Sequence, residues 1–177
     1  MNKSIIFLAL NFFVGGGLMA QTTLTSFEED EAVSSVIFNK PLFEIMAKVG
    51  LDTSNPKDIK FINAIDNIDS IRVFATRSKD VSVALKASVD NYVSQNGLTL
   101  TNTKSGLRFY KKSDGKKENV NEFMMFSDAL NRTKFFGSKR RFNTIFVQLS
   151  GTNIKMENLW VIVEKLDLPE ELLLWNE

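Results

Sequence analysis

Histidine and cysteine are both absent from the 177 residues of this chain. Without histidine, the usual general base near neutral pH and the commonest metal ligand are missing. Without cysteine, thiol nucleophiles, thiolate metal sites, disulfides and lipid attachment to cysteine are excluded. Carboxylates, lysine, tyrosine, serine and threonine remain for chemistry. We therefore expect no metal or cofactor, and we favour a non-enzymatic role while leaving an enzyme open.

Extremes of composition are also missing. The chain is 44% hydrophobic and 24% charged, which is typical of a globular protein and not of a disordered one. Its length favours a single domain with a sizeable core. Phenylalanine is the exception, with fifteen residues, and predicts a core rich in aromatic rings.

The first twenty residues have the pattern of an export signal. Lys3 supplies a positive start, residues 5–14 are apolar except for Asn11, and a small residue, Ala20, stands at the expected cleavage site. We predict a signal peptide at residues 1–20 and a single α+β domain at 21–177. The protein is then exported to the periplasm or the exterior, with no lipid anchor and no transmembrane segment in the mature chain.

Residues 142–166 form the clearest structural unit. Residues 142–150 alternate between apolar and other side chains, which predicts a strand with one buried face. Gly151 is expected to end the strand, and Asn153 to cap a helix. The apolar stripe of that helix consists of Leu159, Ile162, Val163 and Leu166.

Earlier segments add strands and helices to this unit. Strands are predicted at 33–38, 70–76, 98–103, 107–111 and 121–126. Helices are expected from Pro41 to Gly50, from Pro56 to Asn67, and from Ser78 to Gly97. The order is β-α-α-β-α-β-β-β-β-α. It favours an α+β two-layer sandwich with helices on one face of a mainly antiparallel sheet.

Three segments carry a family resemblance. They are residues 36–43 (VIFNKPLF), 68–73 (IDSIRV) and 146–151 (FVQLSG). With the export signal, they resemble the secreted bacterial proteins grouped as the domain of unknown function 4252 family, over about residues 27–166. The resemblance implies an exported protein of the bacterial envelope and brings no catalytic residues. The long 127–141 segment departs from the pattern and leaves open whether a family partner binds here.

Charge is unevenly distributed along the chain. Between residues 104 and 141, eleven basic residues face four acidic ones, and this group includes Arg108, Lys139, Arg140 and Arg141. Such a surplus favours binding to an anionic envelope surface in a salt-dependent way. Nucleic acid fits the charge but not the compartment, so we expect none as a partner. The alternative is a set of solvated loops in which lysine is a common filler.

The sheet face opposite the helices is the second candidate site. The strand alternation directs Phe74, Tyr110 and Phe146 to that face, with Arg72 and Arg108 among them. Exposed aromatic rings beside arginine are typical of a docking surface for an envelope protein. Alternatively, the 127–141 loop or the apolar tail at 168–175 folds across these rings. We expect the tail to pack on the body, with docking of a partner as the alternative.

These patterns leave three functional hypotheses. The leading one is an envelope protein that binds a partner through the open sheet face and the basic loops. The second is a hydrolase or transferase that uses carboxylates, for which Asn63, Asp66 and Asp69 share one helix face. Solvation of a helix end is the favoured explanation of those residues. The third is a structural component that only oligomerises.

Overall fold

The computed structural model describes residues 24–49, 51–113, 120–129, 133–135 and 138–176, with the backbone alone for 133–135 and 138–141. The predicted export signal at residues 1–20 lies outside the described residues. So does most of the turn expected at 113–115. Among the helices that are described, none is long and apolar enough to cross a membrane.

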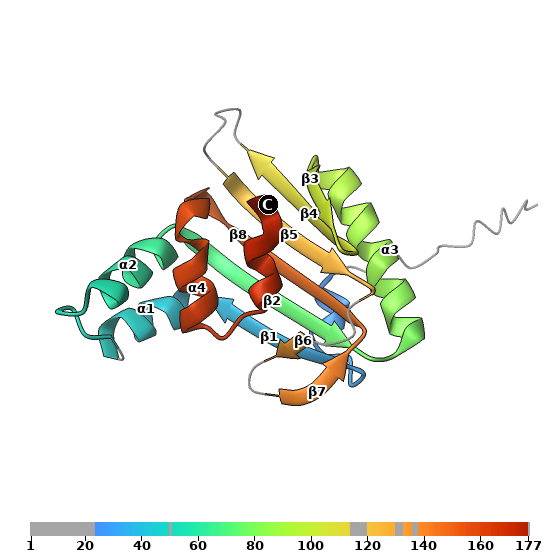
Figure 1. Ribbon diagram of the computed structural model, residues 1–177, viewed down its shortest axis with the longest axis horizontal. Coiled ribbons are helices and arrows are strands. Elements are labelled where there is room, and N and C mark those ends of the chain that lie inside the picture. Colours follow the sequence, from blue (N-terminus) through green and yellow to red (C-terminus); the bar gives the residue numbers. More distant parts are fainter. Residues whose placement is uncertain (1–23, 50, 114–119, 130–132, 136–137, 177) are drawn as a thin grey trace, which may run out of the picture.

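A six-stranded sheet forms the centre of the molecule (Figure 1). Its spatial order is β1-β2-β8-β5-β4-β3, and all five pairings are antiparallel. The strands are β1 (Val33–Asn39), β2 (Ile68–Thr76), β8 (Thr144–Ile154), β5 (Val120–Ser127), β4 (Leu107–Ser113) and β3 (Thr99–Lys104). The segment expected to be a loop contains a small separate hairpin of β6 (Thr133–Phe135) and β7 (Ser138–Phe142). The predicted α+β class and antiparallel sheet are confirmed.

The first three helices begin and end within about two residues of the positions that their sequence signals predict, whereas the last begins later than predicted. They are α1 (Lys40–Val49), α2 (Pro56–Ile65), α3 (Lys79–Asn96) and α4 (Leu159–Lys165), with 3₁₀ turns η1 (Leu24–Phe27), η2 (Met156–Asn158) and η3 (Glu170–Asn176). At the start of α3, the Ser78 hydroxyl accepts a hydrogen bond from the Val81 amide at 3.4 Å. Gly97 ends this helix with a φ of 68°, which glycine adopts without steric cost.

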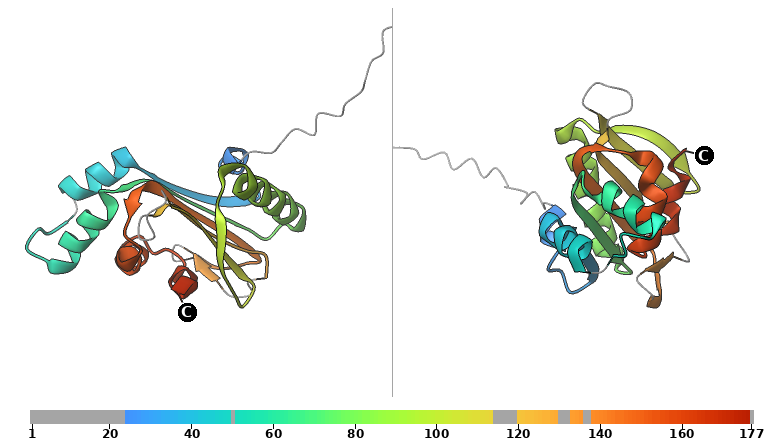
Figure 2. Two further views of the ribbon diagram at one scale, coloured as in Figure 1. Left: turned by 90° about the horizontal axis from the view of Figure 1, so that it is seen from above. Right: turned by 90° about the vertical axis from the view of Figure 1, so that its left-hand side faces the viewer.

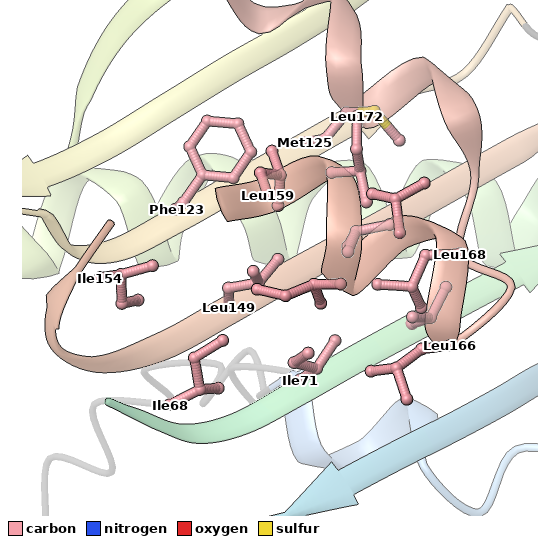
Figure 3. Close-up of a cluster of buried hydrophobic side chains, with 14 of the residues drawn as sticks. Ile68, Ile71, Phe123, Met125, Leu149, Ile154, Leu159, Leu166, Leu168 and Leu172 are labelled. Atoms are coloured by element: carbon pink, nitrogen blue, oxygen red, sulfur yellow. The ribbon is translucent and has the colours of Figure 1, made fainter. Parts of the chain in front are cut away.

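One face of the sheet packs against α2, α4 and η3. Figure 3 shows the contacts of α4 and η3 with this face. Ile71, Val73, Val147 and Leu149 meet the predicted stripe of α4 there, and all are buried. The tail packs on the same core, as expected. Leu172 is fully buried, and the ring of Trp175 meets Phe123 edge-on with 6.1 Å between centroids.

The opposite face is not open, which corrects the one-sided arrangement expected from the sequence. Figure 2 shows α3 and η1 on the side of the sheet away from α4 and η3. Leu85 and Val89 of α3 lie in a second buried core with strand residues that include Phe74 and Phe146. The physical reason is that the central strands carry large apolar side chains on both faces, so both must be covered.

Gly151 does not end β8, contrary to the sequence prediction. The strand continues to Ile154, and Gly151 pairs with Ile68 where the register of β2 shifts. Asn153, expected to cap the last helix, instead has a φ of 58° within the strand. The helix begins only at Leu159, after η2. A Cβ atom on Gly151 would lie 2.0 Å from the carbonyl oxygen of Asn67, so close backbone contact requires the glycine.

This contact predicts different costs for alanine at two glycines. Gly151→Ala is expected to lower the free energy of unfolding by about 3 kcal/mol or more, since backbone must move. Gly97→Ala meets no atom within 4 Å. It is expected to cost about 1 kcal/mol through its positive φ alone. Urea denaturation of both variants measures the two values, and equal costs would contradict the close-contact explanation.

Candidate functional site

The three aromatic rings predicted to face outward are buried. Phe74 and Phe146 are fully enclosed and stack with 5.6 Å between centroids, and Tyr110 is only 6% exposed. Phe27 of η1 packs on Phe74 at 6.3 Å. The prediction of an exposed aromatic surface is therefore wrong, because α3 and η1 cover it. Replacing these rings would cost about 3–5 kcal/mol of stability and would test folding, not binding.

The two arginines predicted to accompany the rings make intramolecular contacts. The Arg72 guanidinium lies 3.3 Å from the Glu28 carboxylate, and Arg108 lies 3.2 Å from that of Asp90. Arg108 also stacks over the Phe126 ring at 4.8 Å. Both therefore hold η1 or α3 on the sheet. Lys139, Arg140 and Arg141 belong to β7, and their side chains lie outside the described part of the chain, so their binding role stays a prediction.

A row of polar side chains borders the second core. Arg72 donates to the Gln148 Oε1 at 3.5 Å, and the Gln148 amide donates to the Glu122 carboxylate at 2.5 Å. Gln148 and Glu122 are buried. Burial, followed by the neighbouring Glu122 carboxylate, raises the pKa of Tyr92 on α3 to about 12. Burial also raises the pKa of Tyr110.

The carboxylates expected along α2 do not form a site. Asp66 follows the helix as its C-terminal cap, and its carbonyl oxygen accepts a hydrogen bond from the Lys40 ammonium. Within the described ranges, no three acidic side chains are grouped as metal ligands. The helix-end explanation of these residues therefore accounts for what is seen.

A groove between α4 and η3 was not predicted. The two elements lie side by side on the same face of the sheet (Figures 1 and 2). The groove has a volume of about 930 Å³. Five apolar residues and four acidic ones line it: Trp160, Val163, Leu168, Leu173 and Leu174, with Glu164, Asp167, Glu170 and Glu171.

Among the residues that the structure describes, no basic one lines the groove, although basic residues of α2 lie behind α4. The Lys57 ammonium is 2.8 Å from the Glu164 carboxylate, and Lys60 lies 5.7 Å from the Trp160 ring. Lys165 pairs with Asp58 at 2.5 Å. That hydrogen bond, with one from the Asp52 amide, holds the pKa of Asp58 below its usual range. These contacts fix α4 against α2 and so position one wall of the groove.

Asp167 stands at a strained position in the groove. It follows the end of α4 with a φ of 48°, and the Leu168 amide donates back to the Val163 carbonyl at 3.0 Å. Glycine is the usual residue at this place in a helix end, although aspartate tolerates it better than most. An aspartate at this position therefore has some backbone strain.

One wall of this groove could have been recognised from the sequence. Trp160, Val163, Glu164 and Asp167 follow one another at the spacing of a single helix face. The other wall is a 3₁₀ turn in the tail. Its docking beside α4 is a tertiary contact that no local pattern encodes.

Comparison with known protein families gives a match over most of the chain. A family model described as Domain of unknown function (DUF4252) matches residues 27–160. No curated protein and no solved structure matches the chain. Of the groove residues, Trp160 alone falls inside the matched range, so the family description gives no account of the groove.

The raised tyrosine pKa values predict alkaline behaviour. Tyr92 and Tyr110 are the only tyrosines in the chain. Both favour the neutral phenol in the folded state, so their stabilising effect is present below pH 10 and is lost as pH rises further. Absorbance titration at the tyrosinate band should show both ionising above pH 10 in the folded protein. In denaturant they should ionise near pH 10. Tyr92→Phe should reduce the loss of thermal stability between pH 10 and 12, and normal titration of both phenols in the folded protein would contradict the burial argument.

Proposed function

This chain belongs to the DUF4252 family, whose description assigns no activity, and we therefore propose from its own surface that it is an exported binding protein. Its ligand is a basic, amphipathic peptide segment of an envelope protein, held in the groove between α4 and η3. The observation that carries the proposal is the lining of that groove, in which the described part of the chain places apolar side chains and four carboxylates but no basic side chain.

Charge and shape together define this ligand. The apolar residues offer contact area for leucine-like or aromatic side chains, and Trp160 is 38% exposed at the border of the groove. Carboxylates around an apolar surface select lysine or arginine on the ligand and disfavour acidic segments through repulsion. A peptide with apolar residues on one side and basic residues at its margins satisfies both requirements.

A carboxylate-dependent hydrolase or transferase is the second candidate, since four acids line one groove. Acid–base and electrostatic catalysis depend on groups held away from water, where their charges act strongly. Glu164, Asp167 and Glu170 are exposed, and Glu164 is paired with Lys57. Solvated carboxylates of this kind suit recognition of a cationic ligand better than catalysis.

A synthetic peptide tests the binding proposal. A short amphipathic peptide of lysine and leucine is titrated into the protein, and the dissociation constant is measured by calorimetry and by tryptophan fluorescence. Asp167→Asn removes a charge and keeps a residue that tolerates positive φ. It should weaken binding about threefold, as expected for one exposed charge pair. Trp160→Ala should weaken binding about tenfold or more.

Matched controls separate this groove from general charge attraction. Glu157→Gln removes an exposed acid of η2 that does not line the groove, and it should leave the dissociation constant unchanged. A peptide with glutamate in place of lysine should not bind. If Glu157→Gln weakens binding as much as Asp167→Asn, the groove is not the binding site.

Export is the second part of the proposal, supported by the charge, apolar run and small residue of the first twenty positions. When the chain is produced in a bacterial host, the mature protein should begin at Gln21 and be found outside the cytoplasm. Mass spectrometry of cell fractions measures both. A full-length chain that stays in the cytoplasm would contradict the proposed compartment and would leave the peptide-binding test unaffected.

A further inference from the structure

The groove between α4 and η3 has two ends that are built from different residues. After α4 ends, the chain turns and η3 returns beside this helix in the opposite direction (Figure 1). The left view of Figure 2 looks along both elements, which lie next to each other. The turn therefore forms one end of the groove. The start of α4 and the last part of η3 form the other end.

Acidic side chains gather at the end formed by the turn. Asp167 lies in the turn and Glu170 begins η3, and both side chains are exposed. Glu171, which also lines the groove, is half-buried at the same end. Glu164 lies one turn earlier on α4, where the Lys57 ammonium at 2.8 Å offsets its charge. The negative potential of the groove is therefore concentrated around the turn.

The opposite end of the groove is apolar and has a base beside it. Trp160 lies on the first turn of α4, and the half-buried Leu174 lies toward the end of η3. The Lys60 ammonium is 5.7 Å from the centroid of the Trp160 ring. Lys155 and Glu157, both exposed just before α4, carry opposite charges that offset each other. A cationic group of a ligand is thus repelled at this end and attracted at the turn.

The distance between the two ends lets each act on its own part of a ligand. Trp160 and Asp167 are seven residues apart in the sequence, which corresponds to roughly 10 Å at the rise of an α-helix. The Debye length at physiological ionic strength is about 8 Å, so charges at one end are largely screened from the other. An extended peptide covers this distance with about three residues.

We propose that the peptide held in this groove has its basic and apolar residues separated along its length. Its basic end binds at the turn beside Asp167 and Glu170, and its apolar end binds against Trp160. This inference rests on the proposed peptide binding and adds the order and the placement of the ligand's residues. A segment in which bases and apolar residues alternate binds more weakly, because it brings a base to the Trp160 end, beside Lys60.

Peptides of one composition and different order test this proposal. Each contains equal numbers of lysine and leucine and has blocked termini, so that no terminal charge takes part. In two peptides the lysines are grouped at the first or the last end, and in a third they alternate with the leucines. By calorimetry, the tighter of the two grouped peptides should bind about fivefold more strongly than the alternating one, as expected for a difference of about one exposed charge pair.

Substitutions in the protein assign each end of the grouped peptide. Asp167→Asn should weaken its binding about threefold, and this effect should vanish when glutamine replaces the lysines of the peptide. Trp160→Ala should still weaken the binding of the glutamine peptide. Lys60→Glu should lower the preference for the grouped order, because a base is then accepted beside Trp160. Lys48→Glu, at an exposed lysine of α1 that does not line the groove, is the matched control and should leave the preference unchanged.

The outcomes separate this inference from the proposed function. Equal binding of grouped and alternating peptides overturns the inference and leaves peptide binding in the groove intact. The inference is also wrong if Asp167→Asn weakens binding of the glutamine peptide as much as that of the lysine peptide, or if Lys48→Glu changes the preference as Lys60→Glu does. If no peptide of any order binds, both the inference and the proposed peptide binding are wrong.

Discussion

Burial on both faces of the central strands is the constraint on which this fold depends. β2 and β8 alternate between two sets of apolar side chains, with Val73 and Val147 on one face and Phe74 and Phe146 on the other. Neither set can face water without a large loss of hydrophobic free energy. The chain meets this requirement by sending α3 and η1 to one face and the other helical segments to the opposite one.

The covering elements differ in how they are held in place. α3 is fixed by its apolar stripe and by polar contacts at its margin, such as Arg108 with Asp90. α4 is fixed by a short apolar stripe and by the ion pairs of α2, including Lys165 with Asp58. The tail turns back after α4, so that η3 lies beside the outer face of this helix. That proximity creates the acidic groove.

Because these aromatic rings are buried, the candidate binding surface lies elsewhere on the molecule. Phe74, Tyr110 and Phe146 looked like a docking surface because strand alternation assigns a face but does not say what covers it. With that face closed, exposed apolar residues gather elsewhere, chiefly on α1 and at Trp160. Trp160 lies in a groove lined with carboxylates. The binding proposal follows from that redistribution.

The local elements could be predicted from sequence because their causes are local. The caps at Ser78 and Gly97, the alternation of β8 and the stripe of α4 depend on neighbours a few residues away. Gly151 shows the limit of this reasoning. A glycine after an alternating run resembles a strand end, whereas here the carbonyl of Asn67 approaches too closely for any side chain.

By itself, the sequence determined the α+β class, most element boundaries and which side chains share a face, since period and capping are properties of the local chain. The tertiary structure alone decided that α3 covers the second face, that η3 stands beside α4, and that β1 lies at an edge. These are contacts between distant segments. Their outcome depends on which packing buries the most apolar surface, and no local pattern records that.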